Sequence, residues 1–161
     1  MIKREDCFEV KKLMPLISIL FLLFGCSNAD EVEISIEEIE TCLTNTLDQM
    51  ETDFEILSSE EVEDGRHAIS LSENTVMFVE GNKVSMANTI TVPKEELLQS
   101  FLILIGCSDE TLSFGERNLL ISELGLRDDE LIDHTKVVNK NNIQYTFSGN
   151  SDALILQAEL K

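Results

Sequence analysis

The stretch Val76-Met77-Phe78-Val79-Glu80-Gly81-Asn82-Lys83-Val84-Ser85-Met86 decides the fold of this 161-residue chain. Its first four residues are branched, aromatic or long apolar residues, a composition typical of a buried strand. Gly81-Asn82 is the kind of dipeptide that makes a tight hairpin turn. The partner strand is then expected to carry the apolar residues Val84, Met86, Ile90 and Val92.

Further strands are predicted on both sides of this hairpin, where apolar residues alternate with polar ones. Upstream, Phe54 and Ile56 alternate with acids, Asp64-Gly65 indicates a turn, and the segment from His67 to Leu71 alternates again. Downstream, a strand is expected over 143–147. Residues 148–151 form a turn, and a last strand follows over 153–160.

Three helices are predicted from their end signals. Ser35 with Glu38, and Ser113 with Glu116, have the spacing of a capping box, and Ile34 with Ile39 has that of a hydrophobic staple. Pro93 suits the first position of a strongly apolar helix that ends near Ile105 and is expected to be the central buried helix. Gly125 followed by Leu126 predicts the end of the third helix. The first helix is expected to turn these residues to the core: Ile36, Ile39, Leu43, Leu47 and Met50.

This order of elements predicts one α+β domain over residues 34–161. Strands that follow one another through short turns pair antiparallel, whereas a parallel sheet needs long crossovers. The expected architecture is an N-terminal helix and an antiparallel sheet of about five strands. Two central helices are inserted before the last two strands.

The N-terminal region has the features of a targeting segment. Lys11 and Lys12 precede the apolar run 13–24, which is shorter than the roughly 20 residues that span a bilayer. The run ends in Leu23-Phe24-Gly25-Cys26, which resembles the lipobox of bacterial lipoprotein precursors, although Phe24 is bulkier than the usual residue. A buried apolar helix or strand that ends in a cysteine is the alternative.

The resemblance implies a signal peptide over residues 1–25 and a diacylglycerol lipid, with palmitate as a typical acyl chain, on Cys26. Residues 26–33 become a lipidated tether, and the domain is held at the cell membrane, facing outside the cytoplasm. Residues 1–9 fit this pattern badly because they contain Glu5, Asp6 and Glu9. We therefore expect that translation starts at Val10 and that residues 1–9 are not made.

The charge of the chain limits the partners it can bind. The formal net charge is −19, and loss of residues 1–25 removes four of 12 basic and three of 31 acidic residues, which leaves −20. Nucleic acid is excluded as a partner because phosphate binding depends on Lys and Arg. Contact of the protein surface with anionic lipid is disfavoured as well. The acids serve solubility alone, or they steer a basic protein or envelope component to the domain.

Two cysteines remain besides Cys26, and they leave two possibilities open. Cys42 and Cys107 both fall in apolar helical contexts, so they are either buried thiols or a disulfide, which the extracytoplasmic location permits. Spacing in the sequence does not show whether two helices meet.

No sequence motif identifies a catalytic or metal site. His67 and His134 are the only histidines, and Asp133 beside His134 could orient its ring, but no nucleophile motif accompanies them. The acidic clusters 60–65 and 128–133 lack the ligand spacing of a calcium loop. No metal and no cofactor other than the covalent lipid is expected.

These features favour a non-catalytic protein that binds a protein or an envelope component as an accessory factor, anchored in the membrane through its lipid. Two alternatives stay open at the level of sequence. One is a small hydrolase that acts on envelope material through acidic residues, and the other is a purely structural lipoprotein. A pocket that converges on two carboxylates or on His134 would favour the hydrolase.

Overall fold

The computed structural model describes residues 33–161, so the predicted signal peptide, Cys26 and the start at Val10 lie outside the described residues. The described residues belong to one compact unit. Among the helices within residues 33–161, none is long and apolar enough to cross a bilayer. The helices and strands are α2 (Ile36–Gln49), β1 (Ser58–Glu61), β2 (His67–Ser72), β3 (Thr75–Glu80), β4 (Lys83–Thr89), α3 (Lys94–Ser108), α4 (Phe114–Glu123), β5 (Thr135–Lys140), β6 (Ile143–Gly149) and β7 (Ala153–Leu160).

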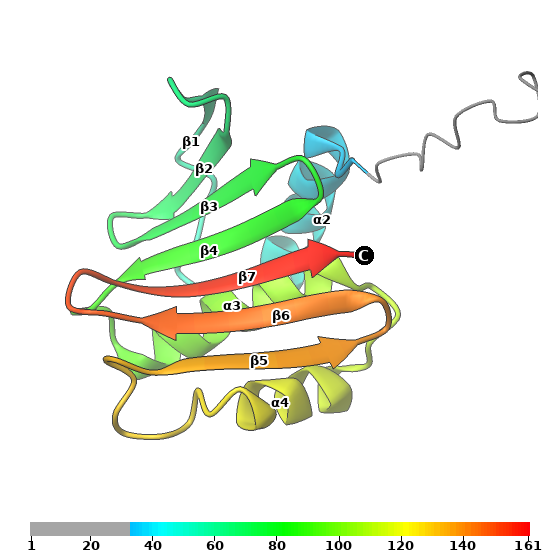
Figure 1. The fold of residues 1–161 in the computed structure, drawn as a ribbon. Helices are drawn as coiled ribbons and strands as arrows, with labels where there is room; N and C mark the ends of the chain where they lie inside the picture. The colour runs from blue at the N-terminus through cyan, green and yellow to red at the C-terminus, as the bar shows by residue number, and fades with distance from the viewer. Residues whose placement is uncertain (1–32) are drawn as a thin grey trace, which may run out of the picture. The chain divides into compact units, whose positions relative to one another are not determined.

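The strands form one antiparallel sheet in the order β1-β2-β3-β4-β7-β6-β5. The first four strands follow one another through short turns, and so do the last three. The two groups meet where β4 pairs with β7, near the middle of the sheet (Figure 1). The predicted α+β class with an antiparallel sheet is confirmed.

The predicted number of strands was wrong, because the sheet has seven strands rather than about five. The helices α3 and α4 therefore precede the last three strands, not the last two. The missed strand is β5, and the first strand lies at Ser58–Glu61 rather than around Phe54 and Ile56. Both are edge strands with mostly exposed side chains, so neither shows the alternation that reveals a half-buried strand.

The predicted hairpin and central helix are both confirmed. Strands β3 and β4 pair across Gly81-Asn82, and Gly81 adopts φ +56°, a conformation that glycine enters without steric cost. Helix α3 lies against β4 and β7 and fills the centre of the core. Its fully buried apolar side chains are Leu97, Phe101, Ile103, Leu104 and Ile105.

The ends of α2 and α4 follow the predicted chemistry, whereas Pro93 is the N-cap of α3 rather than its first residue, and α3 continues past Ile105 to Ser108. Ser35 Oγ accepts a hydrogen bond from the Glu38 amide at the start of α2, and the Ser113–Glu116 capping box at the start of α4 is complete. Helix α4 ends at Glu123, and Gly125 beyond it has φ +72° and forms a Schellman motif: the Gly125 amide donates to the Ser122 carbonyl, and the Leu126 amide donates to the Ile121 carbonyl.

One residue of α2 departs from the prediction. Ile39 and Leu43 are buried, but Ile36 is 37 % exposed and lies in the first turn, outside the core. The hydrophobic repeat correctly located the buried face of α2, and this face begins one turn later than expected.

A buried polar network joins the sheet to α3. Thr75 Oγ1 donates to Asn88 Oδ1 at 2.7 Å, and Asn88 Nδ2 donates to Ser100 Oγ at 3.0 Å. All three side chains are at most 1 % exposed. Buried polar groups are costly without partners, so Asn88 stabilises both neighbours.

Asn88→Ala should lower the free energy of unfolding by about 2–4 kcal/mol, because it leaves two hydroxyl groups buried with fewer partners and opens a cavity. Urea unfolding measures the change. Asn45→Ala, at an exposed position of α2, is the control and should change stability by less than about 0.5 kcal/mol. Equal effects of the two changes would contradict the role given to the network.

Candidate functional site: an acidic groove beside a disulfide

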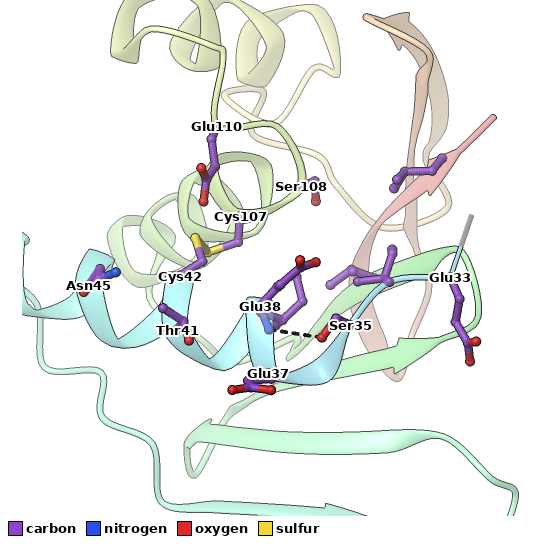
Figure 2. A pocket seen from close by; sticks show the side chains of 14 residues that line it. Glu33, Ser35, Glu37, Glu38, Thr41, Cys42, Asn45, Cys107, Ser108 and Glu110 are labelled. Carbon is purple, nitrogen blue, oxygen red and sulfur yellow. Dashed lines mark hydrogen bonds between the residues drawn. A yellow bond between two sulfur atoms is a disulfide. The ribbon is translucent and has the colours of Figure 1, made fainter. Parts of the chain in front are cut away.

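A groove of about 760 Å³ lies between the N-terminal half of α2 and the C-terminal end of α3. Figure 2 shows Glu38 on the α2 side of the groove and Glu110 on the other side, with the Cys42–Cys107 disulfide between the two helices. The segment that precedes α2 and the last residue of β7 complete the lining. We call it the acidic groove. It is lined by Glu33, Ile34, Ser35, Glu37, Glu38, Ile39, Thr41, Cys42, Asn45, Val84, Cys107, Ser108, Glu110 and Leu160.

The lining carries charge of one sign only. It includes four glutamates and no lysine, arginine or histidine. Within residues 33–161, no ion pair involves any of these four glutamates. The groove therefore holds unneutralised negative charge, which attracts cations from solution.

Two of the four glutamates have a structural reason to be there. Glu37 and Glu38 lie in the first turn of α2, where a negative side chain is stabilised by the helix dipole. Glu33 lies before the helix, and Glu110 lies in the loop between the last residue of α3, Ser108, and the N-cap of α4, Ser113, so neither helix end accounts for its charge. The local structure thus gives no reason for a negative charge at Glu110.

The neighbour of Glu110 is different, because Asp109 is held by its own hydrogen bonds. Burial alone would raise the pKa of Asp109, but hydrogen bonds from Thr111 and Asn141 outweigh this effect and keep the pKa below its ordinary value. Asp109 ties the end of α3 to the turn between β5 and β6. Its carboxylate is used by the fold, whereas that of Glu110 is exposed.

The floor of the groove is apolar. It is formed by Ile39 and Val84, which are at most 3 % exposed, and by the partly buried Ile34 and Leu160. An apolar floor below carboxylates suits lysine and arginine side chains, whose aliphatic stems cover apolar surface while their charged ends stay near water. The arrangement can bind a basic segment.

A second acidic groove, of about 660 Å³, lies at the other end of α2. Its acids are Glu51, Asp53, Glu95 and Glu96, and again no basic residue lines it. Glu95 and Glu96 occupy the first turn of α3, and Glu96 accepts a hydrogen bond from Ser72 at 3.2 Å. Half of its acids thus have a structural role, and its apolar surface is smaller.

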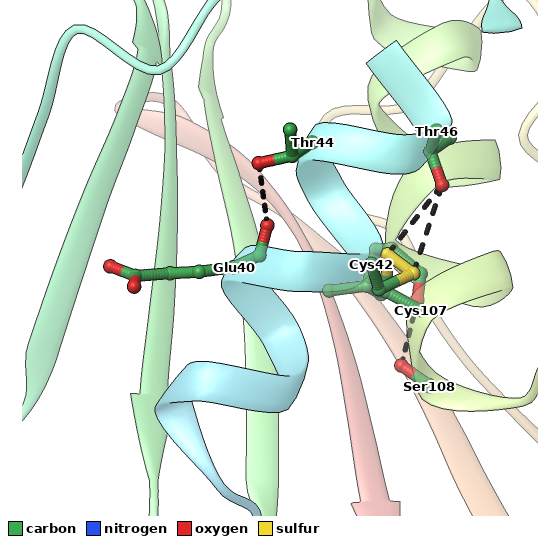
Figure 3. The surroundings of a disulfide bond; sticks show 7 residues. Glu40, Cys42, Thr44, Thr46, Cys107 and Ser108 are labelled. Carbon is green, nitrogen blue, oxygen red and sulfur yellow. Dashed lines mark hydrogen bonds between the residues drawn. A yellow bond between two sulfur atoms is a disulfide. The ribbon is translucent and has the colours of Figure 1, made fainter. Parts of the chain in front are cut away.

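The disulfide forms part of the wall of the acidic groove. Cys42 on α2 and Cys107 on α3 are bridged, with their Cα atoms 5.6 Å apart, inside the roughly 7 Å that a disulfide allows. Figure 3 shows the Thr46 hydroxyl beside both sulfur atoms, at 3.7 Å and 4.0 Å. Of the two possibilities that the sequence left open, the structure has the bridge.

The two acidic clusters noted in the sequence are partly neutralised. In the cluster 60–65, Arg66 Nε donates to Asp64 at 2.7 Å, and this hydrogen bond lowers the pKa of Asp64. In the cluster 128–133, Lys94 Nζ donates to the carbonyl oxygens of Arg127 and Asp128 and to the Asp129 carboxylate. Over residues 33–161, no three His, Cys, Asp or Glu side chains converge in a way that could hold a metal ion.

His67 belongs to a small network that the sequence did not predict. Its Nε2 lies 2.7 Å from Ser59 Oγ, and Ser59 Oγ also contacts the Glu40 carboxylate. An ionised carboxylate only accepts hydrogen bonds, so the Ser59 proton goes to Glu40 and His67 must donate to Ser59. In this arrangement His67 does not act as a base toward Ser59, and the network instead joins β1 to α2.

His134 and Asp133 do not form the pair that the sequence suggested. The structure shows no hydrogen bond between their side chains, and His134 Nε2 is buried without a partner among residues 33–161. The ring lies 5.9 Å from that of Phe147. The residues that make the acidic groove were not predicted, because Glu33 and Glu110 are far apart in sequence and come together only when α2 packs against α3, where the bridge also joins the two helices.

Comparison of the chain with protein families, with curated proteins and with solved structures finds no match. Function must therefore be argued from the acidic groove.

Replacing both half-cystines, Cys42→Ala with Cys107→Ala, should lower the free energy of unfolding by about 4 kcal/mol. The bridge closes a loop of 65 residues, and this is the cost that the chain-entropy account assigns to opening it. Urea unfolding with and without reductant measures it.

Reductant should destabilise the natural chain by a similar amount. It should leave the stability of the double variant unchanged, so this variant is the control for effects of the reductant other than opening the bridge. A natural chain whose unfolding ignores reductant would contradict a stabilising bridge.

Proposed function

We propose that this protein is a lipid-anchored binding or accessory protein of the bacterial cell envelope, non-catalytic, whose acidic groove binds a basic segment of a protein partner. The observation that carries the proposal is Glu110. It is an exposed glutamate in the loop between α3 and α4, where no helix end accounts for its charge, it forms no ion pair within residues 33–161, and it lies on the groove. Selection for fold stability does not favour a negative charge there, whereas binding of a cation does.

The lining of the groove specifies the chemistry of the partner. Carboxylates on both sides pair with ammonium or guanidinium groups, and the apolar floor below them packs against aliphatic stems. A segment with two or more lysines or arginines fits both features. Anionic ligands, including nucleic acid, are repelled.

The place of the groove in the chain supports a partner close to the membrane. Glu33 is the last residue of the proposed tether and also lines the groove. If Cys26 carries the lipid, the groove begins seven positions further along the chain, at Glu33, which is at most about 25 Å of extended chain. Proteins that expose basic segments near the membrane surface are then the natural partners.

Neutralising the groove, with Glu38→Gln and Glu110→Gln together, should weaken binding of a basic peptide about tenfold. Each exposed ion pair between a groove glutamate and the peptide contributes up to about 1 kcal/mol to the free energy of binding. The loss of two such ion pairs corresponds to roughly one order of magnitude in Kd. The probe is an alternating lysine–alanine peptide, with the full chain held in vesicles of uncharged lipid and binding measured by fluorescence anisotropy. Binding by the natural chain should weaken as salt rises, since exposed charges are screened within about 8–10 Å.

The matched control is Glu95→Gln with Glu96→Gln, which removes the same charge from the second acidic groove and should change Kd less than about twofold. Equal weakening of peptide binding by the two double variants would show that only the total charge of the protein matters, and it would refute the acidic groove as the site. Failure of the natural chain to bind the peptide at low salt would refute it too.

A further inference from the structure

The face of the sheet opposite the helices has no helix over it. The side chains of each strand alternate, so those that do not face α2, α3 and α4 form this second face, which we call the open face (Figure 1). We propose that the open face is the interface of a homodimer and packs against the same face of a second copy of this chain. This proposal does not rest on the acidic groove, which lies on the helical side.

The pairing of the strands shows that the positions in the middle of the open face carry no charged residue. One charge reaches over them from the side, because the Arg66 guanidinium, paired with Asp64, lies 4.6 Å from the centre of the Phe78 ring. Two neighbouring rows of side chains cross the six strands from β2 to β5. One row runs from Ser70 to Thr135 through Val76, Ala87, Ile155 and Ser148. The other row consists of Ala68, Phe78, Ser85, Gln157, Thr146 and Val137.

The absence of charge from these twelve positions is unusual for this chain. Charged residues make up 27 % of the sequence, so about three of twelve positions would be charged on average. Depletion of charge is the compositional mark of the core of a protein–protein interface.

The centre of the open face is also apolar. Val76 is paired with Ala87, and Ala87 with Ile155, while Phe78 lies in the neighbouring row two residues along from Val76. These side chains form a continuous patch across β3, β4 and β7. All four are already half-buried by their neighbours on the sheet, so little side-chain freedom remains to be lost when a second sheet covers them.

Charge decides which partner suits this face. A basic partner meets a single carboxylate along the two rows, that of Glu60 where the second row reaches the edge strand β1, and it is attracted to the helical side instead. Two copies of a chain with net charge −19 repel one another, and this repulsion is least where the facing surfaces are neutral. The next row of side chains, beside the one that contains Phe78, carries both positive and negative charges. Lys83 Nζ lies 3.9 Å from a carboxylate oxygen of Glu159, so this row adds no net repulsion between two copies.

The open face is large enough for a stable dimer. Strands are about 4.8 Å apart and rise about 3.3 Å per residue, so seven strands of about six residues present roughly 700 Å². Two such faces bury about 1,400 Å², within the 1,200–2,000 Å² of specific interfaces. Two sheets stacked in this way form a sandwich about 10 Å thick at its centre.

Sedimentation equilibrium of the full chain in a density-matched nonionic detergent tests the proposal. The natural chain should be a dimer at micromolar concentration. Ile155→Glu places a charge at the centre of the face and should raise the dimer dissociation constant at least 100-fold, because like charges then face one another. Gln157→Glu replaces an outward side chain by one of nearly the same shape that carries a charge, so it preserves the fold. It should raise the dimer dissociation constant at least tenfold.

The matched control is Leu119→Glu, which makes the same kind of change at an exposed position of α4 and should shift the constant less than threefold. Three results would overturn the proposal. The first is that the natural chain is monomeric at every concentration, even if a different protein is found to bind the open face. The second is that the dimer is unaffected by both changes on the face. The third is that the control dissociates the dimer as strongly as they do.

Discussion

The position of α2 depends on the bridge between Cys42 and Cys107. Helix α2 fully buries only Ile39 and Leu43, and outside the bridge it is joined to the fold mainly by the packing of a single face and by the contact of Glu40 with β1. The bridge fixes α2 against α3, and these two helices form the walls of the acidic groove. A disulfide of this kind persists in oxidising compartments, so it supports the proposed location outside the cytoplasm.

Much of the fold follows from local chemistry that the sequence displays. The hairpin at Gly81-Asn82, the apolar helix α3 and the caps at Ser113 and Gly125 are each specified by residues within a few positions of one another. The edge strands β1 and β5 were not predictable in this way. Each of them pairs with a single neighbouring strand and exposes most of its side chains. Their residues therefore show no alternation of apolar and polar side chains.

The candidate site was less predictable than the fold, because it is assembled from distant parts of the chain. Clusters of acids in sequence, such as 60–65 and 128–133, proved to lie beside Arg66 and Lys94. The unneutralised charge lies instead where Glu110 meets the first turn of α2. The sides of the domain therefore differ in character, with acidic grooves among the helices and strand positions without charged residues in the middle of the open face, where Arg66 is the charged group that reaches over Phe78. The two proposals are therefore compatible, because a basic partner and a second copy of the chain would occupy different sides of the domain.

The central claim is that an oxidised domain, pinned by its bridge, is tethered outside the membrane by the lipid on Cys26. Mass spectrometry of the protein isolated from the membranes of its own host tests this claim most directly. The account predicts an N-terminal peptide that begins at Cys26 and carries a diacylglycerol lipid, and a second, reducible species that links the peptides of Cys42 and Cys107. An unprocessed N-terminus together with free thiols at Cys42 and Cys107 would contradict it.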